Sequence, residues 1–131
     1  MEDIQRFRFK KEERLTGKKN IERLFKKGIH IYKNCIHAVF LVVEDPQKFP
    51  VRVLFAVSRK KFKRAIKRNL IKRRLRESYR LNKYIIYDQL NLIEKKINLA
   101  LIYEENEIID YKTIEKTVRE VFNEIILNLR E

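Results

Sequence analysis

Runs of β-branched and aromatic residues predict three strands along this chain. They are residues 36–43 (IHAVFLVV), 51–58 (VRVLFAVS) and 97–103 (INLALIY), and each is bounded by residues typical of turns and loops. The first two have similar lengths and are joined by a short loop with Pro46 and Pro50, which favours a β-hairpin between them. A weaker pattern near residues 30–33 allows an earlier short strand.

Apolar residues at helical spacing predict three helices. In the first, Asn20 is a plausible N-cap and Gly28 a plausible stop. Residues 62–83 contain neither Gly nor Pro and predict a long helix that closes over residues 84–87. Residues 110–130 carry the clearest amphipathic pattern, which we interpret as core. Its apolar stripe consists of Ile114, Val118, Val121, Phe122, Ile125 and Leu129.

The order of these elements predicts an α+β fold. A long helix between two strong strands is a βαβ crossover, so part of the sheet should be parallel, and the helices should pack on the sheet as a sandwich. Such crossovers are right-handed by default. The 131 residues correspond to one domain spanning 1–131, in which residues 1–17 have no clear period and are expected to be loosely structured.

Composition excludes several classes of protein. Cys35 is the only cysteine, which removes disulfide frameworks and multi-cysteine zinc sites. His30 and His37 are the only histidines and have no suitably spaced acidic partners, so we interpret both as structural or surface residues, although His37 lies in a strand that could face RNA. Without a long apolar stretch or a signal peptide, we expect a cytoplasmic, reduced protein with no membrane partner.

The positive charge is concentrated in one segment. The chain has a formal net charge of +14, and residues 59–83 contain 13 Lys and Arg but a single acid, Glu77, which gives +12. Residues 84–131, by contrast, sum to −4. A concentrated basic patch is typical of a site for a polyanion, most commonly a nucleic acid.

Within the predicted long helix, basic side chains gather on one face. A projection at 100° per residue places Asn69, Lys72, Arg73, Arg76 and Arg80 within an arc of about 100°. Like charges at this spacing repel by roughly 0.2–0.5 kcal/mol per pair. The basic face could simply be solvated, but we favour the interpretation that the phosphate groups of a ligand supply the missing negative charge. Arg59, Lys60 and Lys61 add cations close to the start of the helix.

Several ordered motifs resemble the bacterial ribonuclease P protein subunit. They are the N-terminal block FKKEERL (residues 9–15), Phe25 and Gly28, AVSRK (residues 56–60), and RNLIKRRLRE (residues 68–77). The last of these is the family's most specific signature, and the match covers about residues 9–127.

The resemblance implies a two-layer α-β sandwich of order αβββαβα, like domain 2 of ribosomal protein S5, with an unusual left-handed βαβ crossover. It also implies a role in a ribonucleoprotein endonuclease that removes the 5′ leader of precursor tRNA. The catalytic centre of that holoenzyme lies in the RNA subunit and uses Mg²⁺, so we expect no catalytic residue and no bound metal in the protein alone, and predict no protein oligomer.

The resemblance, together with the basic segment and the strand that contains His37, gives two sets of candidate site residues. A cleft between the first helix and the sheet would hold the single-stranded leader, with Ile21, Phe25 and His37 as candidates. Ile21 and Leu70 replace the Phe and Arg that are usual in the family, which leaves Phe25 as the better stacking residue. The candidate contacts to RNA are Arg59, Lys60, Arg68, Asn69, Lys72, Arg73, Arg76 and Arg80.

Three alternatives remain open from the sequence. A general or ribosomal RNA-binding protein would explain the charge but not the ordered motifs. A DNA-binding module would need a recognition helix free of the sheet, which Ile71 and Leu75 argue against. A self-sufficient protein nuclease would need a metal-binding cluster of carboxylates, which the pattern does not show.

Overall fold

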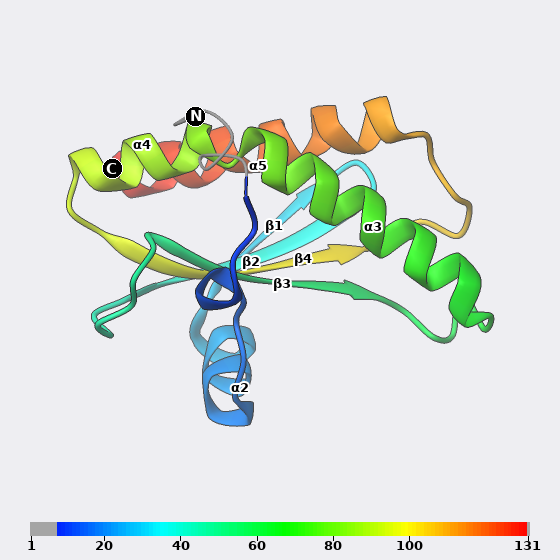
Figure 1. Cartoon of the computed structure of the whole chain (residues 1–131), viewed down its shortest axis with the longest axis horizontal. Helices are drawn as coiled ribbons and strands as arrows, with labels where there is room; N and C mark the ends of the chain where they lie inside the picture. Colours follow the sequence, from blue (N-terminus) through cyan, green and yellow to red (C-terminus); the bar gives the residue numbers. More distant parts are fainter. Residues whose placement is uncertain (1–7, 131) are drawn as a thin grey trace.

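The computed structural model describes residues 8–130, which form one mixed sheet flanked by helices (Figure 1). The strands lie in the order β1-β2-β4-β3. The elements are a 3₁₀ turn η1 (Lys11–Glu13), α2 (Lys18–Lys27), β1 (Ile29–Lys33), β2 (Ile36–Val43), β3 (Val51–Val57), α3 (Ala65–Asn82), α4 (Tyr84–Leu92), β4 (Lys96–Tyr103) and α5 (Tyr111–Arg130).

The predicted hairpin between β2 and β3 is wrong, because β4 lies between these two strands. β4 pairs antiparallel with β2 and parallel with β3. Its residues 97–101 are all buried, and a strand that is apolar on both faces belongs in the interior of a sheet rather than at its edge. The hairpin of the fold instead joins β1 and β2. The short strand that the sequence only weakly indicated near residues 30–33 is therefore present as β1.

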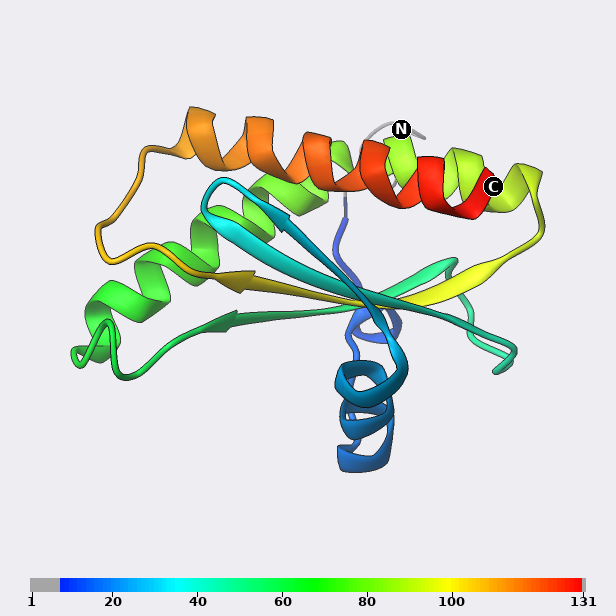
Figure 2. The same cartoon turned by 180° about the vertical axis from the view of Figure 1, so that it is seen from behind.

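The crossover from β3 through α3 to β4 is left-handed. When the sheet is viewed from the side of α3 with the strands pointing up, β4 lies to the left of β3 (Figures 1 and 2). This agrees with the expectation from the resemblance and differs from the default rule. The two long helices share the face: α3 packs on the β3 side, whereas α5 packs against β1 and β2.

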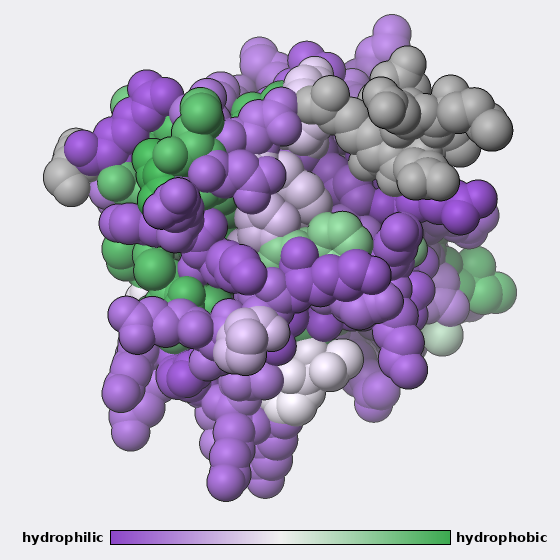
Figure 3. Space-filling model, turned by 60° about the vertical axis from the view of Figure 1, so that its left-hand side comes forward, coloured by the Kyte–Doolittle hydropathy of each residue, from purple (hydrophilic) through white to green (hydrophobic). Residues whose placement is uncertain are grey.

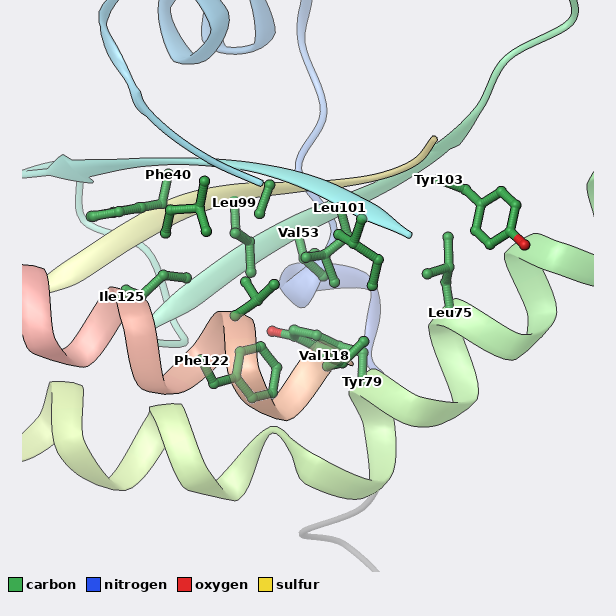
Figure 4. Close-up of a cluster of buried hydrophobic side chains, with 14 of the residues drawn as sticks. Phe40, Val53, Leu75, Tyr79, Leu99, Leu101, Tyr103, Val118, Phe122 and Ile125 are labelled. Atoms are coloured by element: carbon green, nitrogen blue, oxygen red, sulfur yellow. The ribbon is translucent and has the colours of Figure 1, made fainter. Parts of the chain in front are cut away.

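The main hydrophobic core fills the space between the sheet and the layer of α3, α4 and α5 (Figure 4). Tyr79 of α3 and Phe122 of α5 meet edge to face at its centre, with ring centroids 5.8 Å apart. The predicted amphipathic stripe of α5 is therefore core, as expected. The buried stripe of α3 consists of Ile71, Leu75, Ser78, Tyr79 and Asn82, so the opposite side of that helix must face solvent.

The helix α2 packs on the other face of the sheet, over a small second core that includes Leu24 and Val39. Asn20 is not its N-cap: the helix begins at Lys18 after Gly17, and the Asn20 amide donates to the Thr16 carbonyl at 3.3 Å. Gly28 caps the end of the helix, with its amide donating to the Leu24 carbonyl, and no side chain fits there because a Cβ would lie 2.4 Å from that carbonyl oxygen.

Residues 8–17 are held firmly against the sheet and helices, unlike the loose segment that we expected. The Leu15 amide donates to the Val53 carbonyl at 2.9 Å, and the Glu13 carboxylate is buried against Lys83. Residues 1–7 of the same predicted segment lie outside the described residues. Lys83 also separates α3 from α4, where we expected one helix to close over residues 84–87.

Candidate RNA interface

The exposed side of α3 carries the basic face that the sequence predicted. Because Ile71 and Leu75 are buried beneath the helix, Asn69, Arg73 and Arg76 point away from the core and are exposed, and Lys72 is half-buried beside them. The structure therefore places these candidate side chains on one continuous surface.

Two other candidates on α3 have partners within the protein. The guanidinium of Arg68 donates to the Phe62 and Lys63 carbonyl oxygens, both at 2.8 Å, and thereby holds the loop before the helix. Arg80 pairs with Glu77, Nη2 to Oε1 at 2.6 Å, and this hydrogen bond lowers the pKa of the Glu77 carboxyl. Arg68 and Arg80 thus have structural roles beside any contact with RNA.

The loop between β3 and α3 brings further cations next to that face. Arg59 and Lys60 are exposed, whereas Phe62 is buried and anchors the loop. Lys61 turns toward the end of β4, where its ammonium lies 3.3 Å from the Glu104 carboxylate. The two predicted loop residues are therefore free to face a ligand, and Lys61 is engaged.

A groove of about 210 Å³ runs along the edge of β3, between α3 and the segment before α2. Lys72 and Arg76 line its helix side, and Arg14 lies opposite them. The guanidinium of Arg14 lies over the Phe9 ring at 5.5 Å, and that of Arg76 over the Phe55 ring at 6.0 Å. The helical projection missed Arg14, whose only signal was its place in the N-terminal motif.

The three candidates for the leader cleft share the face of the sheet that carries α2. Ile21 is half-buried on the small core, and Phe25 is 36% exposed on the same helix. His37 lies on β2 beside them, with its Nε2 2.8 Å from Nδ1 of His30 and its Nδ1 3.5 Å from the Glu104 carboxylate. Sequence spacing offered no partner for either histidine, and folding supplies them: the two rings contact each other, and His37 also contacts Glu104.

The described part of the chain offers no metal centre and no membrane span. It contains no group of three or more His, Cys, Asp or Glu side chains able to hold a metal ion. None of its helices is long and apolar enough to cross a bilayer. Leu92 at the end of α4, Ile93 just after it and Leu127 on α5 are exposed apolar residues, and Figure 3 shows hydrophobic side chains gathered on one part of the surface.

Comparison with known proteins decides the family. The family model described as ribonuclease P matches residues 9–126. The chain belongs to the ribonuclease P protein family. The ribonuclease P protein component of Porphyromonas gingivalis is 30% identical over 113 residues, which cover 86% of this chain and 82% of that protein. That of Chlorobaculum tepidum is 42% identical over 73 residues, which cover 53% of this chain and 47% of the relative.

Solved structures of ribonuclease P proteins have the same fold. The protein from Thermotoga maritima superimposes with a TM-score of 0.67 at 23% identity, covering 84% of this chain and 94% of the other. The protein from Staphylococcus aureus also gives 0.67, at 20% identity, with 85% and 93% covered. The α-β sandwich predicted from the resemblance is confirmed.

As a ribonuclease P protein, this chain is a subunit of the holoenzyme that processes the 5′ end of tRNA precursors. Its general partners are therefore the ribonuclease P RNA and the tRNA substrate.

Proposed function

We propose that this protein uses two adjoining surfaces in leader removal. The exposed face of α3 and the loop before it bind the catalytic RNA, and the face of the sheet that carries α2 binds the single-stranded leader. The observation that carries the proposal is the convergence of both surfaces at the neighbouring ends of β3 and β4. There Lys61 extends from the basic loop to Glu104, and Glu104 also contacts His37 on the α2 side.

Electrostatics supports the assignment of the basic face to RNA. Arg59, Lys60, Lys72, Arg73 and Arg76 lie on one surface with no acidic residue between them in sequence, and Glu77 is neutralised by Arg80. Such a surface binds phosphates and releases their counterions, so affinity should fall steeply as salt rises. Contacts of this kind carry no sequence information, which suits a subunit that serves many precursors.

The face beside α2 has the properties of a site for single-stranded RNA. Phe25 supplies an exposed ring, and Lys26 and Lys27 supply cations in the last turn of the same helix. Bases of unpaired RNA stack on aromatic rings regardless of their identity, while a basic groove follows the backbone. Leaders of variable sequence need this form of recognition rather than hydrogen bonds to base edges.

We assign the catalytic Mg²⁺ to the RNA subunit. Glu77 and Glu104 are each engaged with a cationic side chain of the protein, Arg80 and Lys61 respectively. Among residues 8–130, no three or more His, Cys, Asp or Glu side chains gather into a ligand set for a metal ion. The protein's contribution is then to offset phosphate repulsion and to position the leader.

The test is cleavage of a precursor tRNA by ribonuclease P RNA at low Mg²⁺, with and without this protein. We expect strong rescue by the protein and cleavage at the mature 5′ end. Precursor tRNA should also bind the holoenzyme more tightly than mature tRNA does. Tight RNA binding without any effect on cleavage by a cognate RNA subunit would instead indicate a general RNA-binding protein.

A further inference from the structure

A column of three aromatic rings stands on the β1–β2 hairpin. The rings of Tyr32 and His37 are stacked with centroids 4.3 Å apart and planes 10° from parallel. His30 continues the column on His37, at 5.0 Å and 25°. The two strands bring these rings together, because Tyr32 is the register partner of His37 across the antiparallel pair.

The outer member of the column is open to solvent. Tyr32 is 72% exposed, the most exposed aromatic side chain among the large apolar residues of the described chain. Its only ring contact within residues 8–130 is with His37. A flat ring that packs on the protein through one face leaves the other face available to a further aromatic group.

The inner members of the column are held in place. His37 is fixed at both ring nitrogens, by His30 at 2.8 Å and by Glu104 at 3.5 Å. The Nε2 atom of His30 lies 3.4 Å from the carbonyl oxygen of Phe25 at the end of α2. Contacts from three elements thus orient the column and connect it with the face that carries α2.

We propose that this column is a stacking platform for an unpaired base of the leader, with Tyr32 as the residue that touches the base. The inference rests on the proposed function, and it extends the leader-binding surface from the side of α2 to the edge of the sheet. Figure 2 shows β1 as the outer strand, on the side of the sheet away from α3.

An unpaired RNA base fits this surface better than the bases of a duplex. Bases within a double helix are stacked on one another and are not available to a protein ring, whereas single-stranded bases can be splayed out and stacked on Tyr and His. Lys26 and Lys27, in the turn of α2 that leads into β1, supply cations for the adjoining phosphates. The platform therefore favours single-stranded RNA of any sequence.

A competing explanation is that the rings only stabilise the hairpin, since aromatic cross-strand pairs do so in many sheets. The two explanations differ in what a substitution changes. Loss of a hairpin contact lowers the melting temperature and weakens all RNA binding together. Loss of a stacking platform weakens only the binding of a precursor whose leader reaches Tyr32.

The experiment measures binding of precursor tRNAs with progressively longer leaders, and of mature tRNA, to the holoenzyme containing wild-type or Tyr32→Ala protein. We expect the wild-type holoenzyme to gain affinity at a leader length where the variant does not. The expected difference is roughly 5- to 150-fold, the usual effect of removing one stacking ring. An abasic nucleotide at that position should weaken the wild type equally and leave Tyr32→Ala unchanged.

Two further variants separate stacking from apolar bulk. Tyr32→Phe keeps the flat ring and should bind like the wild type, whereas Tyr32→Leu should behave like Tyr32→Ala. Leu92→Ala is the matched control, because Leu92 is similarly exposed, at 76%, but lies on α4. It should leave binding of every leader unchanged.

The outcomes distinguish the platform from the proposed function. If the wild-type holoenzyme prefers precursor to mature tRNA but Tyr32→Ala behaves identically at every leader length, the platform is wrong and the proposed function stands. If Tyr32→Ala weakens mature tRNA and precursor alike, the rings are structural and the platform is again wrong. If the wild type shows no preference for precursor, the proposed function itself fails.

Discussion

Lys83 and Glu13 form a buried ion pair across 70 residues of sequence, with Nζ 2.6 Å from Oε1. Their side chains are 5% and 0% exposed. The other oxygen of Glu13 accepts from the Lys10 amide at 2.6 Å, and the Tyr87 hydroxyl donates to the paired oxygen at 2.5 Å. The pair therefore fastens the segment before α2 to the junction of α3 and α4.

Removal of one partner should strongly destabilise the protein. In Glu13→Ala, the Lys83 ammonium would remain buried without its counter-ion, and breaking a buried pair in this way costs about 3–5 kcal/mol. The free energy of unfolding in urea measures the effect. The double variant Glu13→Leu/Lys83→Met should recover much of the loss, because neither charge remains buried. A double variant whose loss equals the sum of the losses of Glu13→Leu and Lys83→Met, each measured alone, would show that the residues do not interact.

Arg73 and Arg68 should respond differently to substitution, although both lie in the RNA motif. Arg73 is exposed on the basic face, so Arg73→Ala should reduce the slope of log affinity against log salt for ribonuclease P RNA by roughly 1. Arg68→Ala should also weaken binding, but for a different reason. The Arg68 guanidinium donates to the Phe62 and Lys63 carbonyls, so its removal also loosens the loop before α3.

Binding titrations at several salt concentrations measure both slopes. Lys95→Ala is the control, because Lys95 is an exposed cation between α4 and β4, away from the basic loop. It should leave affinity and slope nearly unchanged. An unaltered slope for Arg73→Ala would show that Arg73 does not contact a phosphate.

Ile66 should contribute an apolar contact inside this charged surface. It is 82% exposed in the first turn of α3, beside Lys63, Arg64 and Lys67, so it does little for the core. If RNA covers it, Ile66→Ala loses one to two buried methylene equivalents at about 0.8 kcal/mol each, which corresponds to roughly 4- to 15-fold in affinity. The salt slope should stay the same, in contrast to Arg73→Ala.

The same titrations test this contact, and thermal unfolding shows whether the substitution changes stability. Leu92→Ala again serves as the matched exposed apolar control. Equal RNA affinity for wild type and Ile66→Ala would place Ile66 outside the interface.

The protein should lose stability at alkaline pH because of its buried tyrosines. Burial raises the pKa of Tyr79 above its usual range, and burial, together with Tyr79 and Glu13, does the same for Tyr87. The unfolded chain releases these protons near pH 10 and the folded chain retains them. Stability is therefore complete below about pH 10 and falls above it, by up to about 1.4 kcal/mol per pH unit for each buried tyrosine.

Urea unfolding between pH 8 and pH 11.5 provides the measurement. Tyr79→Phe removes one of these protons, so its free energy of unfolding should decline less steeply above pH 10 than that of the wild type. Parallel declines for the two proteins would mean that Tyr79 does not contribute to the alkaline loss.

Local sequence patterns predicted the helices and strands themselves better than they predicted which strands pair in the sheet. The stripe of α5 and the opposite faces of α3 follow from helical spacing alone, and both are present. The order of the strands does not follow from such spacing: β2 and β3 resemble a hairpin until β4, some 40 residues later, is placed between them. The only local signal was that β4 is apolar on both of its faces.

Some features of the candidate site could likewise be predicted from local patterns, and others could not. The exposed positions of Asn69, Arg73 and Arg76 could be read from the helix period. The partners of Arg68 are backbone carbonyls, whose positions depend on a loop conformation that no residue pattern encodes. The contacts of His37 come from β1, through His30 and Tyr32, and from Glu104 after β4, so only the folded structure reveals them.

The central place of β4 also governs when this chain can fold during translation. β2 and β3 acquire their shared neighbour only after residue 103 has left the ribosome. Until then α3, with most of the positive charge, has no completed sheet to cover, and pairings between distant segments form slowly. The nascent chain therefore presents its cationic helix before its core exists, which makes premature capture by ribosomal RNA a hazard of its biosynthesis.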